Sequence, residues 1–301
     1  MKKKMNRNKL YDHIQGYTFI SPAIVLLAVF VYISIVVAIY MSFNEVNLFR
    51  WTFDFVGFNN YKRIFTEDRI FKAFSNTTKF VAVVAPMQTV LALILAAVLN
   101  SKIRAQKAFR IVYFLPTLTS STALTMIFMF IFSISGPYNT IGKALGFVQE
   151  ATNWLNEPKF ALKIIMCMNI WSTVPYYMTI YLSALQDVPA SLYEAAEVDG
   201  ANAVLRFLNI TVPHMKPITS FVFITGIIGT FQMFDQAYIF SNGSGGPQNS
   251  TLTVALMVYQ YAFSLLNDMG LASAVAIVLS IVIIIASALA NKLNKSEKLY
   301  S

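Results

Sequence analysis

The feature that most constrains this sequence is a series of long stretches without a formal charge. Residues 14–44 are 31 consecutive uncharged residues, 80–101 are 22 and 164–186 are 23. A helix of about 20 apolar residues crosses the hydrocarbon core of a bilayer. Only 12% of the chain is charged, against about 25% in a soluble domain. We therefore predict an all-α membrane protein with six transmembrane helices, at 14–44, 80–101, 111 to about 135, 164–186, 218 to about 240 and 269–291.

The distribution of Lys and Arg predicts the orientation. If both termini lie in the cytoplasm, cytoplasmic segments hold 14 of the 23 basic residues and outer loops hold 7, with the other two at helix ends. Basic residues concentrate in cytoplasmic loops, so the pattern favours N-in and C-in. Because these residues lie in short segments beside apolar runs, they do not indicate nucleic acid binding. A seventh crossing at 251–266 would place the tail outside, so we expect an interfacial or re-entrant segment there.

The same pattern divides the chain into five parts. These are a basic cytoplasmic arm (1–13), the first transmembrane helix (14–44), an extracellular loop (45–76), a core domain with the other five helices (77–291) and a cytoplasmic tail (292–301). The first apolar run is too long for a secretory signal and lacks a cleavage site of small residues, so it indicates a retained anchor. A single cysteine, Cys167, provides no disulfide framework.

A polar segment at 187–217 interrupts the apolar runs between the fourth and fifth predicted crossings. Its centre, residues 194–201, has the sequence EAAEVDGA. Ala195 and Ala196 leave a nearly bare helical face that another protein surface can approach closely. Gly200 favours the left-handed conformation that ends a helix and starts a new direction. The segment therefore predicts two short helices joined by a bend.

This segment also carries a resemblance to a known family. The stretch EAAEVDGANAVLRFLNITVPHMKP at 194–217 resembles the EAA loop of ABC-importer permeases, which has the pattern E-A-A, three residues, G-A and an apolar segment that ends in a proline. Three further segments are similar to family elements: FVGFNNY at 55–61, FR and then FLP within 109–116, and GGP at 245–247. The likeness is closest to the permeases for maltose, glycerol-3-phosphate and other oligosaccharides.

The resemblance implies a type I ABC-importer permease fold in a bacterial plasma membrane, and a sugar or oligosaccharide as the transported solute. It implies four kinds of partner: a second homologous permease subunit, a dimer of cytoplasmic ABC ATPases, an extracellular solute-binding protein and membrane lipid. ATP and Mg would lie on the ATPase, and this chain would bind no cofactor. In the family, the loop docks into a cleft of the ATPase. The residues that would carry this contact here are Glu194, Ala195, Ala196, Asp199, Gly200, Ala201 and Pro213.

No catalytic or metal-binding motif is present in the sequence. It lacks a Gly-x-x-x-x-Gly-Lys-Ser/Thr phosphate loop, and neither His13 nor His214 has a second ligand at metal-binding spacing. We therefore expect a non-catalytic transport subunit. Two alternatives stay open: an ion-coupled secondary transporter, for which Asp235 is the one candidate buried acid, and an ABC importer for a solute such as glycerol phosphate, a polyol or a peptide.

Polar and aromatic side chains within the fourth and fifth predicted crossings are candidates for a translocation path. Sugar hydroxyls need hydrogen-bond partners and flat aromatic faces, and polar groups at membrane depth are costly unless they face protein or water. The same residue types also serve as interfacial anchors or bond to their own helix. We expect Asp235 to point outward. The path candidates are Asn169, Trp171, Ser172, Tyr176, Tyr177 and Gln232.

Overall fold

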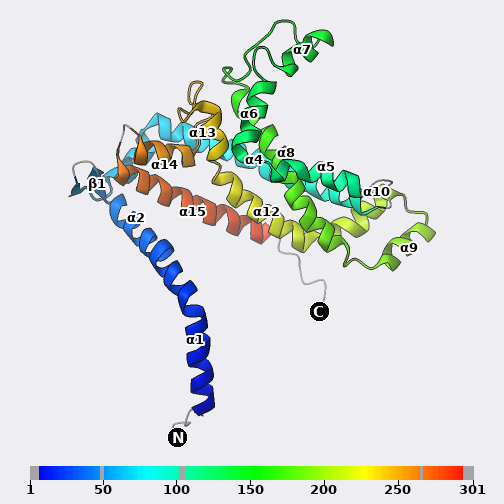
Figure 1. Ribbon diagram of the computed structural model, residues 1–301, viewed down its shortest axis with the longest axis horizontal. Coiled ribbons are helices and arrows are strands. Elements are labelled where there is room, and N and C mark those ends of the chain that lie inside the picture. The colour runs from blue at the N-terminus through cyan, green and yellow to red at the C-terminus, as the bar shows by residue number, and fades with distance from the viewer. Residues whose placement is uncertain (1–6, 48–50, 102–105, 265–266, 294–301) are drawn as a thin grey trace.

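A single long helix leads into the helical body of the protein (Figure 1). The computed structural model describes residues 7–47, 51–101, 106–264 and 267–293. The leading helix consists of α1 (Arg7–Leu27), the π-helical turn η1 (Ala28–Ile33) and α2 (Ser34–Ser42). Its most apolar stretch buries no residue against the rest of the described chain, so lipid or another protein must cover it. This helix matches the first predicted crossing; of the predicted arm at 1–13, residues 1–6 lie outside the described part.

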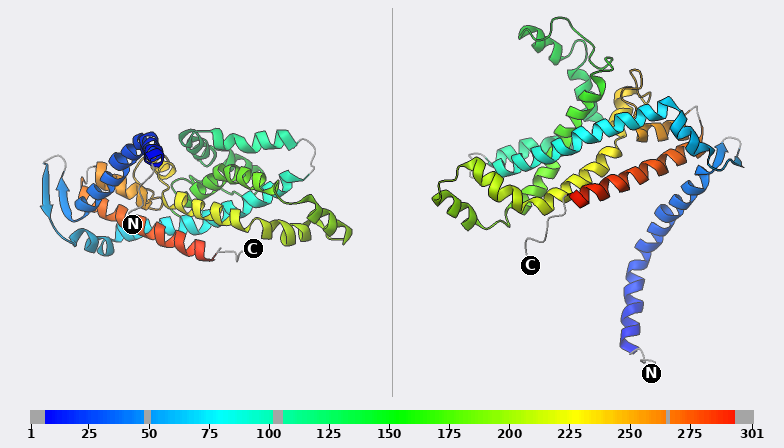
Figure 2. Two further views of the ribbon diagram at one scale, coloured as in Figure 1. Left: turned by 90° about the horizontal axis from the view of Figure 1, so that it is seen from below. Right: turned by 180° about the vertical axis from the view of Figure 1, so that it is seen from behind.

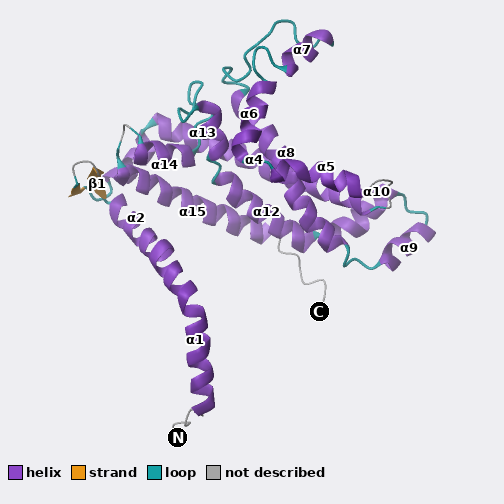
Figure 3. Ribbon diagram, viewed as in Figure 1, coloured by secondary structure: helices purple, strands orange, loops and turns teal. Residues whose placement is uncertain are grey.

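The predicted extracellular loop at 45–76 is a folded unit. Strands β1 (Asn44–Asn47) and β2 (Thr52–Phe55) pair in antiparallel register, and Figure 3 shows this hairpin beside the helices. Helix α3 (Asn59–Thr66) follows, and α4 starts at Asp68. The sequence analysis did not predict this hairpin, because four-residue strands are too short to leave a clear alternating pattern.

The FVGFNNY element explains how this unit is held together. Gly57 has a φ of +56°, which Gly adopts without steric cost. The buried amide of Asn60 donates to the backbone carbonyls of Ser42 and Asn44, each at 3.0 Å, and the hydroxyls of Tyr61 and Ser42 lie 2.8 Å apart. These bonds join α3 to the end of the first transmembrane helix.

Ion pairs anchor the same unit to the C-terminal half of the chain. Arg63 contacts Asp268 through Nη1 at 2.6 Å and Glu67 through Nε at 2.9 Å. Burial alone would lower the pKa of Arg63, but its hydrogen bonds to the two carboxylates outweigh burial and raise the pKa above its ordinary value. The hydroxyl of Tyr261 donates to the other oxygen of Glu67 at 2.8 Å.

Four helices form the centre of the body. Helix α4 (Asp68–Asn100) packs along α8 (Ala161–Leu185), and α12 (Lys216–Phe231) lies between α4 and α15 (Met269–Leu293), as Figure 2 shows. Helix α4 has 33 residues and begins nine residues before the predicted core boundary at 77. This extension was not predicted, because the start of α4 carries charged residues and the prediction followed uncharged runs.

The third predicted crossing is bent rather than straight. Helices α5 (Gln106–Leu118) and α6 (Ser121–Ile131) meet at 104°. Pro116 weakens the end of α5 because it lacks a donor, and the hydroxyl of Ser120 accepts the amide of Ala123 at 3.2 Å to start α6. Helix α7 (Pro137–Ala144) then projects from the body (Figure 1). Of the predicted cytoplasmic segment before α5, residues 102–105 are not described.

The segment after α8 is a chain of short helices. Helix α9 (Ala190–Val198) is followed by α10 (Ala203–Arg206), the π-helical turn η2 (Phe207–Thr211) and α11 (Val212–His214), which lead into α12. Beyond α12 come α13 (Asp235–Ser241) and α14 (Val254–Phe263). Six of the ten residues of α14 are buried, and it packs on α4 and α15. This burial favours the re-entrant packing helix over the interfacial one.

Five of the six predicted crossings correspond to described helices that are long and apolar enough to span a membrane. Four are single helices, and the bent pair makes a fifth. The remaining prediction, 164–186, falls on α8, which has the length but is too polar to pass the same criterion. The hairpin β1–β2 and the segment around α9 lie at opposite ends of the body (Figure 1), as the predicted orientation requires.

Candidate functional site

The first candidate site is the EAA loop, residues 187–217, whose centre is a closed helical turn. Helix α9 ends at Val198, and Gly200, two residues later, has a φ of +79°. The amide of Ala201 donates to the carbonyl of Ala196 at 2.8 Å, and the amide of Gly200 donates to Glu197 at 3.1 Å. This pair of bonds is a Schellman motif, which satisfies the last carbonyls of a helix. The bend predicted at Gly200 is therefore present.

Side chains hold the second half of the EAA loop against the first. The guanidinium of Arg206 on α10 lies 3.1 Å from the carboxylate of Glu197 on α9. The hydroxyl of Tyr193 on α9 lies 2.9 Å from that of Thr211 on η2. The side chain of Asn202 accepts the amide of Leu205 at 2.9 Å and so caps α10. The loop is a braced helix–turn–helix rather than an irregular connection.

The predicted coupling residues take different positions in this loop. Glu194 and Ala195 are exposed on α9, whereas Ala196, Ala201 and Pro213 are half-buried inside the turn or at α11. Asp199 forms the C-cap of α9 through its backbone only; its carboxylate caps nothing among the described residues, and Asn202 supplies the side-chain cap. The second half of the loop is nearly continuous helix, because Pro213 occupies the first turn of α11, where its missing donor is tolerated.

Exposed apolar side chains lie on α9 and on the short helices that follow it. Val198, directly before the turn, is 89% exposed. The loop exposes four more large apolar side chains, at Leu192, Val204, Leu205 and Leu208. Exposed apolar residues grouped beside charged ones are typical of a protein–protein contact surface.

The second candidate site is a polar cavity between the broken helices. One part has a volume of about 200 Å³, lies where α12 ends and α13 begins, and is lined by Ser121, Asn169, Gly229, Gln232, Met233, Phe234, Asp235 and Gln236. An adjoining part of about 280 Å³ shares Ser121 and Gln236 and adds Pro116, Thr117, Thr119, Leu124, Ser172, Thr173, Tyr176 and Tyr177. Helix α8 contributes residues at spacings of three and four, which place them on one face.

Hydrogen bonds position the polar groups around this cavity. The amide of Asn169 donates to the side-chain oxygen of Gln236 at 3.0 Å. The hydroxyl of Thr173 donates to the side-chain oxygen of Gln88 at 2.8 Å, which joins α8 to α4. A Cβ added to Gly226 would lie 2.4 Å from Gln88 Nε2, so this glycine makes room for the Gln88 side chain. The lining residues come from α5, α6, α8, α12 and α13, and Gln88 of α4 supports the wall through Thr173.

Five of the six predicted path residues line the polar cavity. These are Asn169, Ser172, Tyr176, Tyr177 and Gln232. Trp171 does not belong to this set. It is 50% exposed on another face of α8, where it lines an apolar groove of about 540 Å³ with residues of α4 and α5 and lies 5.7 Å from the ring of Phe128. Trp171 follows Asn169 by two residues, which places the two side chains on nearly opposite faces of α8.

Sequence reasoning missed several residues of the cavity. Asp235, expected to point outward, lines it, as do Gln236 and the three hydroxyl residues Thr117, Thr119 and Ser121. These residues lie at or beside helix ends: α12 ends at Phe231 with Gln232 as its C-cap, and α13 begins at Asp235. Two signals were available, the polar cluster within the apolar run at 218–240 and the hydroxyl-rich stretch after Pro116.

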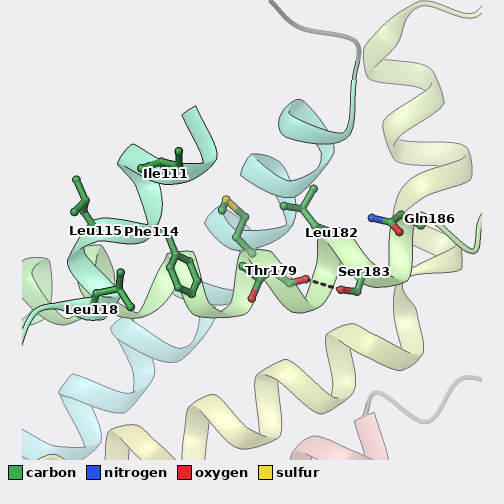
Figure 4. Close-up of a pocket in the computed structure, with 9 residues that line it drawn as sticks. Ile111, Phe114, Leu115, Leu118, Thr179, Leu182, Ser183 and Gln186 are labelled. Carbon is green, nitrogen blue, oxygen red and sulfur yellow. Dashed lines mark hydrogen bonds between the residues drawn. The ribbon is translucent and has the colours of Figure 1, made fainter. Parts of the chain in front are cut away.

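A second apolar groove lies between α5 and α8 (Figure 4). It has a volume of about 450 Å³ and is lined mainly by aliphatic and aromatic side chains, with Thr179 and Ser183 among them. The hydroxyl of Ser183 donates to the backbone carbonyl of Thr179 at 3.2 Å, as the dashed line in Figure 4 shows, and that of Thr179 donates to the backbone of Tyr176. With these hydroxyls satisfied within the helix, the groove offers few polar partners to a sugar.

Comparisons with known proteins agree with this architecture. Residues 88–298 match the family described as the binding-protein-dependent transport system inner membrane component. The chain is 36% identical to the lactose transport system permease protein LacF of Rhizobium radiobacter, over 93% of each chain. It is 34% identical to the multiple sugar-binding transport system permease protein MsmF of Streptococcus mutans, over 97% of this chain and 99% of that protein.

A solved structure shares the fold at low sequence identity. A chain from a bacterial ABC transporter involved in the import of the acidic polysaccharide alginate aligns with a TM-score of 0.77 and 20% identity, over 95% of this chain and 98% of that one. The extent of the family match and of the alignments to curated relatives leads to one conclusion. The chain is a multi-pass bacterial plasma-membrane protein that belongs to the family of inner membrane components of binding-protein-dependent transport systems.

Proposed function

We propose that this chain is one permease subunit of an ATP-driven importer for a sugar or oligosaccharide, and that it forms half of the translocation path with a second, homologous permease. Two curated relatives are named for the transport of lactose and of multiple sugars. The polar cavity supports the same class of solute, because amide, hydroxyl and tyrosine groups line it together. Sugar-binding sites use such groups to pair with hydroxyls and to pack on ring faces.

The EAA loop is the part of the chain that we assign to coupling. Its braced turn supports this role because a rigid element transmits the movement of a partner without absorbing it. The exposed Glu194, Ala195 and Val198 would contact a cytoplasmic ABC ATPase, with Ala196, Asp199, Gly200, Ala201 and Pro213 shaping the surface that they form. ATP and Mg would bind to a dimer of that ATPase, and an extracellular solute-binding protein would deliver the solute.

Coupling requires that the ATPase binds the loop differently in two states of the transporter. A partner shifts a conformational equilibrium only by its differential affinity for the two states. The EAA loop therefore moves with the ATPase, and the polar cavity opens alternately to the two sides of the membrane. The single observation that carries it is the Schellman turn at Gly200, which fixes the angle between α9 and the helices that lead to α12.

Uptake measurements test the proposal. The chain is reconstituted in proteoliposomes with its second permease and solute-binding protein, with and without the ATPase, and uptake of labelled oligosaccharides is measured with ATP inside. The account predicts uptake only when ATPase and ATP are both present. ATP-independent uptake driven by an ion gradient would instead support the secondary transporter, for which the broken helices and Asp235 are the only structural arguments.

A further inference from the structure

The polar cavity contains one charged side chain, and it is an acid. Among the described residues that line its two parts, Asp235 carries the only formal charge, and no Lys, Arg or His is present. The side chain of Asp235 is exposed in the cavity rather than buried in the wall. It makes no ion pair or hydrogen bond with any described residue.

An unpaired carboxylate in this location needs an explanation. Charged groups within transmembrane segments are costly, and they persist where they face water or a ligand. Asp235 lies at the junction of α12 and α13, in the break of an apolar helix. No described side chain neutralises it, so within this chain the carboxylate faces only water and whatever solute enters the cavity.

A second group in the same wall also lacks a partner. The amide nitrogen of Asn169 bonds to Gln236, but its oxygen, Asn169 Oδ1, is buried and accepts no hydrogen bond in the described part of the chain. Buried side-chain oxygens almost always have a donor. Because this oxygen is enclosed in the wall, the charged acceptor that a solute in the cavity meets is the carboxylate of Asp235.

We propose that Asp235 makes the cavity selective for neutral, polyhydroxylated solutes over anionic ones. This inference rests on the proposed function and names the charge class of its solute. Hydroxyl groups donate to the free acceptors and satisfy them. The carboxylate of a uronic or aldonic acid, a sulfonate or a phosphate brings a second negative charge to Asp235, and like charges brought together without water are strongly disfavoured.

The comparison with the alginate transporter sharpens the inference. That transporter imports an acidic polysaccharide and has the same fold. Since fold alone does not determine the solute, charge selectivity depends on the residues in the path. A path with an unpaired acid and no base among its described lining residues is suited to neutral rather than anionic solutes.

Matched solutes test the inference directly. Binding to the detergent-solubilised transporter, assembled without its solute-binding protein, is measured by saturation-transfer NMR. The probes are lactose, cellobiose and an arabinotriose, each paired with its aldonate, in which the reducing end is oxidised to a carboxylate. The wild-type protein is expected to prefer the neutral member of a pair by about tenfold or more. Asp235→Asn should reduce this preference at least about fivefold, and Asp235→Lys should reverse it.

The control is Glu150→Gln, which neutralises an exposed acid in the outer segment after α7 and should leave the preference unchanged. Thermal unfolding of each variant separates misfolding from altered selectivity. An unchanged preference in folded Asp235→Asn or Asp235→Lys overturns the inference and leaves the saccharide importer in place. If no saccharide of either kind binds to the wild type, the proposed function fails together with the inference.

Discussion

The EAA loop and the polar cavity are held together by different kinds of interaction. In the loop, every bond that sets the bend joins residues close in sequence: Ala201 to Ala196, Gly200 to Glu197 and Arg206 to Glu197. In the cavity, the defining bonds join distant segments, such as Asn169 to Gln236 and Thr173 to Gln88. The loop is a local structure at the surface, and the cavity is a product of tertiary packing.

This difference implies different responses to mutation. A local turn depends on the conformation of one or two backbone positions, so a change there affects coupling while the transmembrane helices stay intact. A packed polar wall depends on matched partners across helices, so a change there affects both stability and solute binding. The predictions below use matched variants to separate these responses, from the largest expected effect to the smallest.

The largest effect is expected for Gly200→Pro. Proline fixes φ near −65° and lacks the amide that Gly200 donates to Glu197. The turn cannot form. A loss of about 3 kcal/mol in the stability of the turn corresponds to an uptake rate reduced by about 100-fold. Uptake and membrane insertion are measured together, and insertion should be normal.

The matched control is Gly146→Pro, because Gly146 has nearly the same φ, +80°, but lies after α7, in the segment predicted to be outside. Its effect on uptake should be small. Equal losses in both variants would mean that the EAA turn has no special role in coupling.

Asn169→Ala tests the cavity by removing one partner from a polar pair. Gln236 is buried and would lose its hydrogen bond, which costs about 1–3 kcal/mol and predicts solute binding weaker by about tenfold. Trp171→Leu changes a residue two positions away that lines the apolar groove instead. Solute titrations should show little change for Trp171→Leu. A larger loss at Trp171 than at Asn169 would contradict the assignment of the path.

Gly226→Ala tests how tightly the cavity wall is packed. The new Cβ would lie 2.4 Å from Gln88 Nε2, and displacing that side chain should destabilise the protein by about 1–3 kcal/mol. Gly229→Ala is the matched control on the same helix, since nothing lies within 4 Å of its added Cβ. Thermal unfolding should show a lower Tm for Gly226→Ala and an equal or higher Tm for Gly229→Ala.

The smallest effect is expected for Arg206→Ala. Its ion pair with Glu197 is partly exposed on the Glu197 side, and such pairs contribute about 0.2–1 kcal/mol. Uptake should fall by less than about fivefold, and added salt should reduce the difference from wild type. A loss as large as that of Gly200→Pro would show that the ion pair, rather than the turn, sets the geometry of the loop.

The same contrast explains which features could be predicted from the sequence. The bend at Gly200 was predicted because a glycine after an alanine-rich helix is a local signal. The apolar runs predicted helices near the positions where five crossings lie. The hairpin β1–β2, the 104° bend before Ser121 and the start of α4 at Asp68 were missed, because each depends on packing or capping that uncharged runs do not record.

The cavity was predicted in part for a similar reason. Helical spacing places Asn169, Ser172, Tyr176 and Tyr177 on one face of α8, and the same spacing could have excluded Trp171. Asp235 and Gln236 follow Gln232 by three and four residues, so helical spacing would place them near the same face even in a continuous helix. They were missed because we expected the charged side chain to point away from the path.

The central claim is that the EAA loop lies in the cytoplasm, within reach of the ATPase. The direct measurement replaces Val198, which is 89% exposed, by cysteine in a Cys167→Ser background, and treats intact cells with a membrane-impermeant maleimide. Leu145→Cys, at a 71% exposed position after α7, serves as the outer control. The account predicts labelling of Leu145→Cys but not of Val198→Cys in intact cells, and labelling of Val198→Cys in inverted vesicles that bound ATPase reduces. Labelling of Val198→Cys in intact cells would contradict it.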